Sequence, residues 1–215
     1  MDFIPKEIED YALAHTEDEP LVLKELARET QAKMLNPRML CGKLQGKLLS
    51  LISKMSKPKC ILEIGTFTGY SAICLAQGLE KDGILHTIEI DEELEDFIKG
   101  YLEKAHLNKK VKLHIGNALE VIPTIEDNFD LVFIDADKPN NIYYYKMIME
   151  KLNPGGIILV DNVLWSGKVL QPSDKKDLDT LSIKQFNEMV QKDDRVENLM
   201  LPFRDGLSII RKKRL

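Results

Sequence analysis

Hydrophobic side chains recur every three or four positions through the first third of the chain, which is the spacing of an amphipathic helix. The pattern predicts helices over residues 5–15, 20–31 and 42–55. Proline begins the first two segments, where a helix tolerates it best because the first helical N–H has no partner within the helix. Pro58 closes the third segment, and a different pattern begins after it.

Short apolar runs alternate with amphipathic stretches from Lys59 onward. Continuous apolar runs are typical of strands buried on both faces of a parallel sheet, and the stretches between them predict the covering helices. The predicted strands are residues 60–64, 84–90, 111–115, 131–134 and 157–160. The predicted helices are residues 70–79, 92–105, 118–125 and 141–152. The pattern therefore predicts an α/β fold with right-handed crossovers.

The last part of the chain departs from this alternation. Residues 173–192 have helical spacing, and two strand-like runs follow at 196–201 and 207–211. The connection over residues 202–206 is short enough for a hairpin, so we expect the sheet to end in an antiparallel pair. A chain of 215 residues has room for one well-buried core. We expect a single domain, with a helical part at 1–57 and the core at 58–215.

Composition and charge exclude several classes of protein. The chain is 44% hydrophobic and 30% charged, with a formal net charge of −5, so it carries no general field that attracts nucleic acid or an anionic membrane. Its N-terminus has no pattern of a secretory signal, and no apolar run is long enough to cross a bilayer. The basic run 211–214 is interpreted as a solvated strand end. Three cysteines without paired spacing argue against a disulfide framework and favour the cytoplasm.

A glycine-containing loop follows the first predicted strand. Gly65 and Gly69 permit a sharp turn and a close approach of ligand to backbone. Ser71 opens the next helix, whose free N–H groups can hold a carboxylate. The segment has neither the dinucleotide-binding spacing nor the Lys-Ser/Thr pair of a phosphate loop. A ligand loop and a purely structural turn both remain open.

The next two strand ends carry residues suited to a nucleoside. Glu89 follows the second strand, where a carboxylate can accept ribose hydroxyls; a solvated acid is the alternative. Ala118 begins the helix after the third strand and leaves space for an adenine ring.

Hard metal ligands follow the fourth and fifth strands. Asp135 begins the run Asp-Ala-Asp-Lys, and Asp161 and Asn162 follow the fifth strand. Ligands of such sheets bind beyond the carboxyl ends of the strands, where these side chains should converge. Two carboxylates and an amide oxygen suit Mg²⁺, Mn²⁺ or Ca²⁺ and leave coordination positions open. Turn capping is the alternative for each residue taken alone.

The histidines do not add to this picture. They show no zinc-like spacing and no nucleophile to activate, so we interpret them as structural or exposed: His15, His86, His106 and His114.

From about Met39 to its end, the chain resembles the class I methyltransferases. Within them it is similar to the cation-dependent O-methyltransferases typified by caffeoyl-CoA O-methyltransferase and catechol O-methyltransferase. The resemblance rests on residues 63–71, on Asp-Ala-Asp-Lys at 135–138, on Asp-Asn with Leu-Trp at 161–165, and on Asp-Gly-Leu at 205–207. It implies a Rossmann-like doubly wound sheet, mostly parallel, with an antiparallel C-terminal hairpin and preceding N-terminal helices. Gln45 and Lys47 depart from the family pattern, in which an acidic residue and a Gln are usual.

The resemblance also assigns roles to residues. Those implied to contact S-adenosylmethionine (SAM) are Met39, Glu63, Gly65, Ser71, Glu89, Ala118, Asp135 and Asp137. Those implied to bind the divalent cation, Mg²⁺ before Mn²⁺ or Ca²⁺, are Asp135, Asp161 and Asn162. Lys138 is the implied general base, with a salt bridge to a neighbouring Asp as its alternative role. Lys138, Trp165 and Arg204 are expected beside the acceptor; Trp165 has an alternative role as a loop anchor.

The resemblance thus implies methyl transfer from SAM to one hydroxyl of a catechol-like, vicinal dihydroxy aromatic small molecule by a cytoplasmic homodimer. One alternative acceptor is a hydroxylated uridine in tRNA, which the basic run at 211–214 keeps open although the net charge is acidic. An NAD-dependent oxidoreductase would share Glu89 but would lack its glycine fingerprint. A non-catalytic SAM-binding protein is the third alternative.

Overall fold

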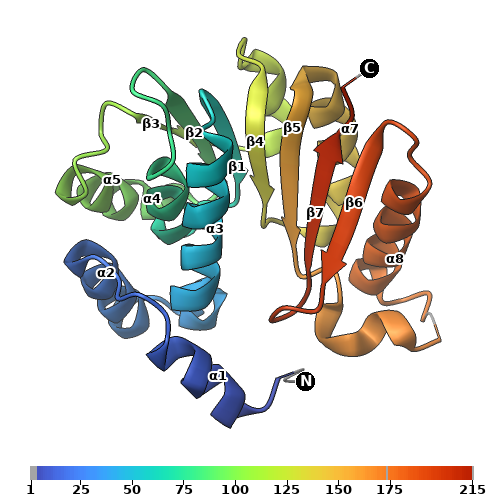
Figure 1. The fold of residues 1–215 in the computed structure, drawn as a ribbon, viewed down its shortest axis with the longest axis horizontal. Helices are drawn as coiled ribbons and strands as arrows, with labels where there is room; N and C mark the ends of the chain where they lie inside the picture. Colours follow the sequence, from blue (N-terminus) through green and yellow to red (C-terminus); the bar gives the residue numbers. More distant parts are fainter. Residues whose placement is uncertain (1–3, 173, 215) are drawn as a thin grey trace.

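One seven-stranded sheet organises the chain, with strand order β3-β2-β1-β4-β5-β7-β6 (Figure 1). The computed structural model describes residues 4–172 and 174–214. The strands are β1 (Cys60–Ile64), β2 (Ile84–Glu89), β3 (Val111–Ile115), β4 (Phe129–Ile134), β5 (Leu152–Asp161), β6 (Val196–Leu201) and β7 (Leu207–Lys212). β1 to β5 pair in parallel, and β7 runs antiparallel between β5 and β6. The predicted fold class is confirmed.

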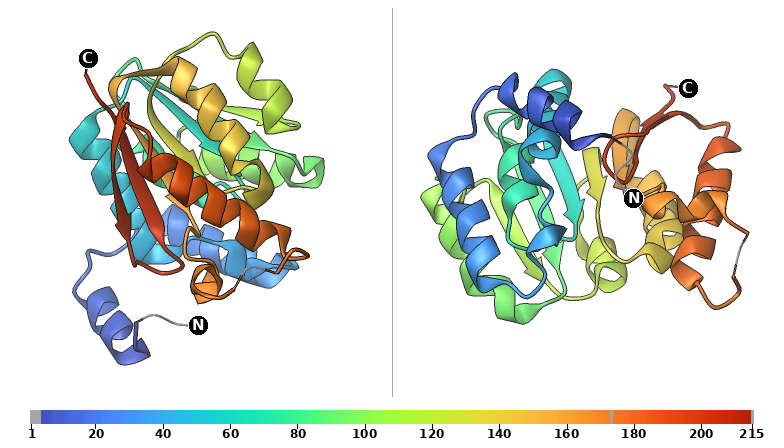
Figure 2. Two further views of the ribbon diagram at one scale, coloured as in Figure 1. Left: turned by 90° about the vertical axis from the view of Figure 1, so that its right-hand side faces the viewer. Right: turned by 90° about the horizontal axis from the view of Figure 1, so that it is seen from below.

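Helices cover both faces of this sheet. One face packs against α2 (Leu21–Lys33), α3 (Gly42–Ser56), α4 (Tyr70–Ala76) and α5 (Glu95–Lys104). The other packs against α6 (Ala118–Val121), α7 (Asn141–Lys151) and α8 (Leu178–Gln191). In the left view of Figure 2, α3 lies on one side of the sheet and α7 and α8 lie on the other. α1 (Lys6–Ala14) buries none of its residues and lies beyond α2.

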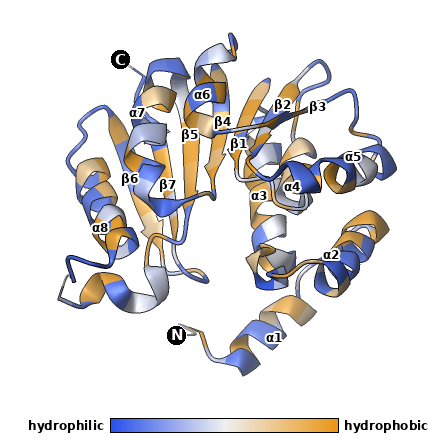
Figure 3. Ribbon diagram, turned by 180° about the vertical axis from the view of Figure 1, so that it is seen from behind, coloured by the Kyte–Doolittle hydropathy of each residue, from blue (hydrophilic) through white to orange (hydrophobic). Residues whose placement is uncertain are grey.

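The apolar runs of the sequence become the two cores. All five residues of β1 are buried, and successive side chains point to opposite faces of a strand. Ile61 therefore packs into the core beneath α3 and α4, and Leu62 packs into the core beneath α7. Figure 3 shows the central strands in hydrophobic colour, whereas the helices change colour along their length because one side of each faces water.

Several predicted helix boundaries are wrong. The helix predicted at 173–192 begins only at Leu178, because the side chain of Asp177 accepts the N–H of Thr180 at 3.1 Å and caps it; Ser173 lies outside the described residues. The helix predicted at 70–79 ends at Ala76. The helix predicted at 92–105 begins as a 3₁₀ turn, η2 (Glu92–Leu94), and the helix predicted at 118–125 ends as one, η3 (Ile122–Thr124).

β4 and β5 begin earlier than predicted. β5 starts at Leu152, which was assigned to the preceding helix, and Leu152 pairs with Phe129. The side chain of Asn153 donates to Asp130 Oδ1 at 2.7 Å and ties the two strand starts together. Pro154 and the two glycines after it are poor strand formers, so the sequence pattern conceals this part of β5.

The strand order reverses between β1 and β4, whose chain connections leave in opposite directions. Such a switch point opens a crevice at the carboxyl ends of the strands, where doubly wound proteins bind their ligands. Three further 3₁₀ turns, η1 (Pro37–Met39), η4 (Lys138–Asn140) and η5 (Trp165–Leu170), complete the fold. Within residues 4–172 and 174–214, no helix has the length and apolar content to cross a membrane.

Candidate active site

Gly65 brings the two sides of the crevice together. Its φ of +94° lies in the region that favours glycine, and a Cβ at this position would stand 2.2 Å from the backbone oxygen of Asp135. The N–H of Asp135 donates to the carbonyl of Ile64 at 2.9 Å. The loops after β1 and β4 therefore touch through their backbones, and a side chain at position 65 would push them apart.

Glu63 presents an unsatisfied oxygen inside the protein. The side chain is fully buried, and its Oε2 accepts the Thr87 hydroxyl at 2.5 Å. Oε1 makes no hydrogen bond of good geometry within the described residues, which is costly for a buried polar atom, although the nearby Ser71 hydroxyl lowers the pKa of Glu63 against the effect of burial. Burial raises the pKa of Glu63 to about 8. A cationic N–H donor from a ligand would satisfy this oxygen, so the residue fits the amino end of SAM.

Glu89 joins the loops after β2 and β1. Its Oε1 accepts the N–H groups of Ile90 at 2.9 Å and Asp91 at 3.0 Å, and its Oε2 accepts that of Phe67 at 2.6 Å. A carboxylate has about four acceptor positions, so one remains for a ribose hydroxyl.

Two smaller residues complete this side of the crevice. Ser71 is buried in the first turn of α4, and Ala118 is buried as the first residue of α6. The structure thus places both at the edge that the sequence predicts.

Two of the residues implied to contact SAM are more exposed. Met39 ends η1 with 58% of its surface accessible. Asp137 is exposed and accepts the Asn140 side-chain amide and the Tyr144 hydroxyl, each at 2.6 Å. The sequence pattern does not predict these two contacts, which fix the turn after β4. The roles of Met39 and Asp137 toward SAM stay predictions.

Lys138 points at Asp135 from the turn η4. Lys138 is buried, and its Nζ lies 3.4 Å from Asp135 Oδ1, so the alternative salt bridge is present. Burial raises the pKa of Asp135, the Lys138 ammonium opposes this shift, and the neighbouring Asp161 carboxylate adds to it. The Asp161 carboxylate thus lies near enough to act on Asp135, and both acids stand at the carboxyl ends of their strands, β5 and β4.

Asp161 and Asn162 end β5 in a fixed conformation. Asp161 is buried, and its Oδ1 accepts the N–H of Asn162 at 2.8 Å. Asn162 has a φ of +59°, which Asn adopts more readily than most residues. The donor set of Asp135, Asp161 and Asn162 offers only oxygen ligands, which fits a hard divalent cation. The carboxylates of the half-buried Asp135 and the buried Asp161 also repel each other, and a cation would relieve that repulsion.

Gln45 is a site residue that the sequence analysis recorded only as a departure from the family pattern. It is 1% exposed; its Nε2 donates to Asp161 Oδ2 at 2.7 Å, and its Oε1 accepts from Arg204 at 2.7 Å. Gln45 precedes Leu49 by four positions and Ile52 by seven, and both of these residues face the core. This helical spacing predicts that Gln45 also points inward.

The loop after β5 packs on the β6–β7 hairpin. The carbonyl of Asp205 accepts the N–H of Leu164 at 2.9 Å, and the Asp205 carboxylate accepts the N–H of Ser166. Trp165 is half-buried beside this contact, whereas Arg204 is exposed on the hairpin.

Backbone strain concentrates in these loops. Non-glycine residues rarely have positive φ, and such residues gather at functional sites. The described residues of this kind at the carboxyl edge of the sheet are Phe67, Asn162, Trp165, Ser166 and Arg204. Only Lys57 and His106 lie elsewhere among those described.

The switch point has one side whose residues suit a nucleoside and one acidic side, which is the arrangement expected of a SAM-dependent methyltransferase. The comparisons agree. The chain is 32% identical to the O-methyltransferase from Bacillus cereus in complex with SAH, with a TM-score of 0.89 over 96% of this chain and 97% of that one. The O-methyltransferase TomG from Streptomyces achromogenes, in complex with SAM, is 30% identical, with a TM-score of 0.88 over 96% of both chains.

A family model described as O-methyltransferase matches residues 13–213. Caffeoyl-CoA O-methyltransferase 2 from Populus trichocarpa is 34% identical over 205 residues, covering 90% of this chain and 83% of that protein. Catechol O-methyltransferase domain-containing protein 1 from Mus musculus is 35% identical over 170 residues, covering 77% and 64%. The chain belongs to the O-methyltransferase family and is a SAM-dependent enzyme. These relatives give no support to the tRNA acceptor or to an NAD-dependent oxidoreductase.

Proposed function

We propose that this enzyme transfers the methyl group of SAM to one hydroxyl of a catechol-like, vicinal dihydroxy aromatic small molecule, and that it requires a divalent cation, with Mg²⁺ the first choice. The observation that carries the proposal is the pair of neighbouring acids, the half-buried Asp135 and the buried Asp161, with the Lys138 ammonium beside Asp135. The names of the relatives, caffeoyl-CoA and catechol O-methyltransferase, support the acceptor class.

Asp135, Asp161 and Asn162 would hold the cation. A bound divalent cation supplies a Lewis acid that lowers the pKa of an acceptor hydroxyl, which for a phenol is about 10. Gln45 positions one of these acids, because its amide donates to Asp161 Oδ2 and leaves the orientation of that carboxylate fixed.

Lys138 would act on the acceptor proton. Its Nζ is buried next to Asp135. A divalent cation held by Asp135 would disfavour the ammonium, and the neutral amine would accept the proton as the hydroxyl oxygen attacks. The new bond joins that oxygen to the methyl carbon, and the bond from carbon to the SAM sulfur breaks. Alignment of oxygen, carbon and sulfur accounts for a large part of such an acceleration.

Arg204 and Trp165 would bound the acceptor on the hairpin side. The Arg204 guanidinium is exposed, and its hydrogen-bond partner is the neutral amide of Gln45 rather than a carboxylate, although its positive charge also acts on Asp135. An acceptor that carries a carboxylate as well as two neighbouring hydroxyls therefore suits this site.

The proposal is tested by methyl transfer from radiolabelled SAM to 3,4-dihydroxycinnamic acid, with and without Mg²⁺ after EDTA treatment. Turnover that appears only with Mg²⁺ supports both parts of the proposal. Undiminished turnover in EDTA contradicts the cation requirement. Absence of turnover with Mg²⁺, while SAM still binds by calorimetry, contradicts the acceptor class.

We also propose that the enzyme is a homodimer. In Figure 1, no helix of the described chain lies in front of β5, β7 and β6. Leu199 is 55% exposed on β6 and pairs with Ile209 on β7, so both side chains belong to this open face. Light scattering should give a dimer mass for the wild type, and Leu199→Glu should lower it; a monomeric wild type contradicts the proposal.

A further inference from the structure

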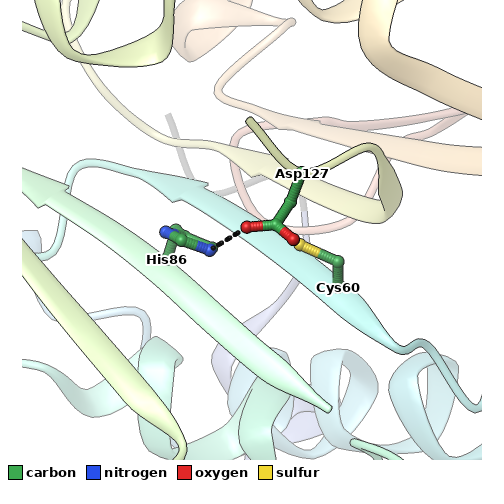
Figure 4. A group of neighbouring side chains, drawn as sticks. All are labelled: Cys60, His86 and Asp127. Carbon is green, nitrogen blue, oxygen red and sulfur yellow. Dashed lines mark ion pairs between the residues drawn. The ribbon is translucent and has the colours of Figure 1, made fainter. Parts of the chain in front are cut away.

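Three side chains with metal-binding atoms meet at the opposite end of the sheet from the crevice. Cys60, His86 and Asp127 point toward one another, from β1, from β2 and from the segment between η3 and β4 (Figure 4). Their ligand atoms all lie within 4.8 Å of one another, and His86 Nε2 is 3.2 Å from Asp127 Oδ2.

The register of the sheet creates this cluster. Cys60 pairs with Ile84, so His86, two residues further along β2, points to the same face. Cys60 is the first residue of β1, whereas the ligand loop leaves the other end of that strand. The cluster is therefore separate from Asp135 and Asp161.

His86 is buried with its Nε2 facing the Asp127 carboxylate at 3.2 Å. The residue is 2% exposed, and its Nε2 makes no hydrogen bond of good geometry within the described residues. Its Nδ1 lies 3.0 Å from His114 Nε2, and the two rings stack with their centroids 5.2 Å apart. If Nδ1 carries the proton and donates it to His114, the lone pair of Nε2 faces Cys60 and Asp127. Metal-binding histidines are oriented in this way through their second nitrogen.

Cys60 is positioned through its backbone. Its N–H donates to Asp130 Oδ2 at 3.1 Å, and the N–H of Lys59 donates to the same oxygen at 2.8 Å. The other oxygen of Asp130 accepts from Asn153. Both carboxylate oxygens of Asp130 thus accept hydrogen bonds from residues at the starts of β1 and β5. The Cys60 thiol is buried and free of any disulfide.

We propose that Cys60, His86 and Asp127 form a second metal site, which binds Zn²⁺ and is independent of the oxygen-lined site in the crevice. Sulfur, imidazole and carboxylate together are zinc ligands, whereas Mg²⁺ takes oxygen ligands. As the zinc–sulfur bond forms, the Cys60 thiol releases its proton to solvent. Asp127, whose side chain is 54% exposed, borders solvent, so water can fill the fourth position.

The geometry requires only a small adjustment. Ligands at about 2.0–2.3 Å in a tetrahedral zinc site lie roughly 3.3–3.8 Å apart. The nitrogen–oxygen pair is already at 3.2 Å. Because no ligand pair is separated by more than 4.8 Å, closure needs a movement of about 1 Å. The exposed segment that carries Asp127 can supply that movement.

Cobalt absorption tests the proposal without reference to activity. EDTA-treated protein in excess Mg²⁺ is titrated with Co²⁺, and the near-ultraviolet thiolate-to-cobalt charge-transfer band is recorded. We expect a band that saturates at about one cobalt per chain and disappears when Zn²⁺ is added. Cys60→Ser should abolish the band. Cys74→Ala, which changes another buried cysteine, should retain it, and so should Asp135→Asn, because the crevice contributes no sulfur.

Measurements of Zn²⁺ affinity test which residues bind the metal. Asp127→Asn alters an exposed carboxylate and should fold normally, yet weaken Zn²⁺ binding at least tenfold in a chelator competition. His114→Ala should weaken it about 10–100-fold through the loss of ring orientation. Absence of the band in the wild type, its survival in Cys60→Ser, or its loss in Asp135→Asn overturns the proposal. If Cys60→Ser does not fold, unchanged Zn²⁺ affinity in Asp127→Asn overturns it.

Discussion

The two sides of the crevice are held by different kinds of contact. Beside β1 and β2, backbone groups make the contacts: Glu89 accepts three N–H groups, and Gly65 lets one loop rest on another. Beside β5 and the hairpin, side chains bridge distant parts of the chain, as Gln45 does between Asp161 and Arg204. The geometry of the side proposed to bind SAM thus depends on the path of the backbone, whereas that of the side proposed to bind the acceptor depends on the identity of a few side chains. We infer that acceptor choice can change by substitution while SAM binding persists.

Asp135→Ala should give the largest effect and should separate the two sides most clearly. Loss of a cation ligand should lower kcat by at least about 100-fold, because an electrostatic stabiliser at the reacting atoms contributes that much or more. SAM affinity, measured by calorimetry, should change far less. Asp127→Asn, which removes a carboxylate at the opposite end of the sheet, is the control and should keep full turnover. Full metal-dependent turnover in Asp135→Ala would show that the acid does not bind the cation.

Gly65→Ala should disrupt the backbone side. The new methyl group would stand 2.2 Å from the Asp135 oxygen, at a φ that disfavours alanine. We expect a loss of about 2–4 kcal/mol in the free energy of unfolding, measured by urea denaturation, together with weaker SAM binding. Gly100→Ala is the matched control: it lies inside α5 with open space around its Cβ position, so helix propensity should make it neutral or stabilising. Equal effects of both substitutions would mean that the contact at position 65 is unimportant.

The same contrast explains what the sequence could predict. Each buried strand ends where its apolar run meets a polar residue, so Glu63, Glu89, Asp135 and Asp161 could be placed at one edge from the pattern alone. The bond from Gln45 to Asp161 spans 116 positions and depends on how α3 packs, which no local pattern contains. The zinc cluster depends in the same way on sheet register. The pattern does not predict the early start of β5, because Pro154 is a residue that strands disfavour.

Gln45→Met should have a moderate effect on the acceptor side. The substitution conserves volume but leaves Asp161 Oδ2 and the Arg204 guanidinium without their partner. Leaving a buried acceptor unsatisfied costs about 1–3 kcal/mol, and we expect kcat/KM to fall about tenfold with little change in SAM affinity. Gln31→Met, at an exposed position of α2, is the control. A kcat/KM equal to that of Gln31→Met would show that Gln45 does not position Asp161.

The pH dependence of SAM binding should give the smallest effect and probes Glu63, which together with Glu89 is one of two buried acids described beside β1 and β2. Glu63 has a pKa of about 8 in the free protein, raised by burial from 4.5. Since the folded pKa is the higher one, the contribution of Glu63 to stability is complete below about pH 4.5 and is lost as pH rises through about 8. A cationic SAM group beside Glu63 favours the ionised form, so binding should release a proton. SAM affinity should then rise with pH up to about 8, by at most tenfold per pH unit. Calorimetry in buffers of different ionisation enthalpy measures the released proton. Glu63→Gln should bind SAM more weakly and without this pH dependence. If the variant and the wild type show the same pH profile, Glu63 does not face the SAM amino group.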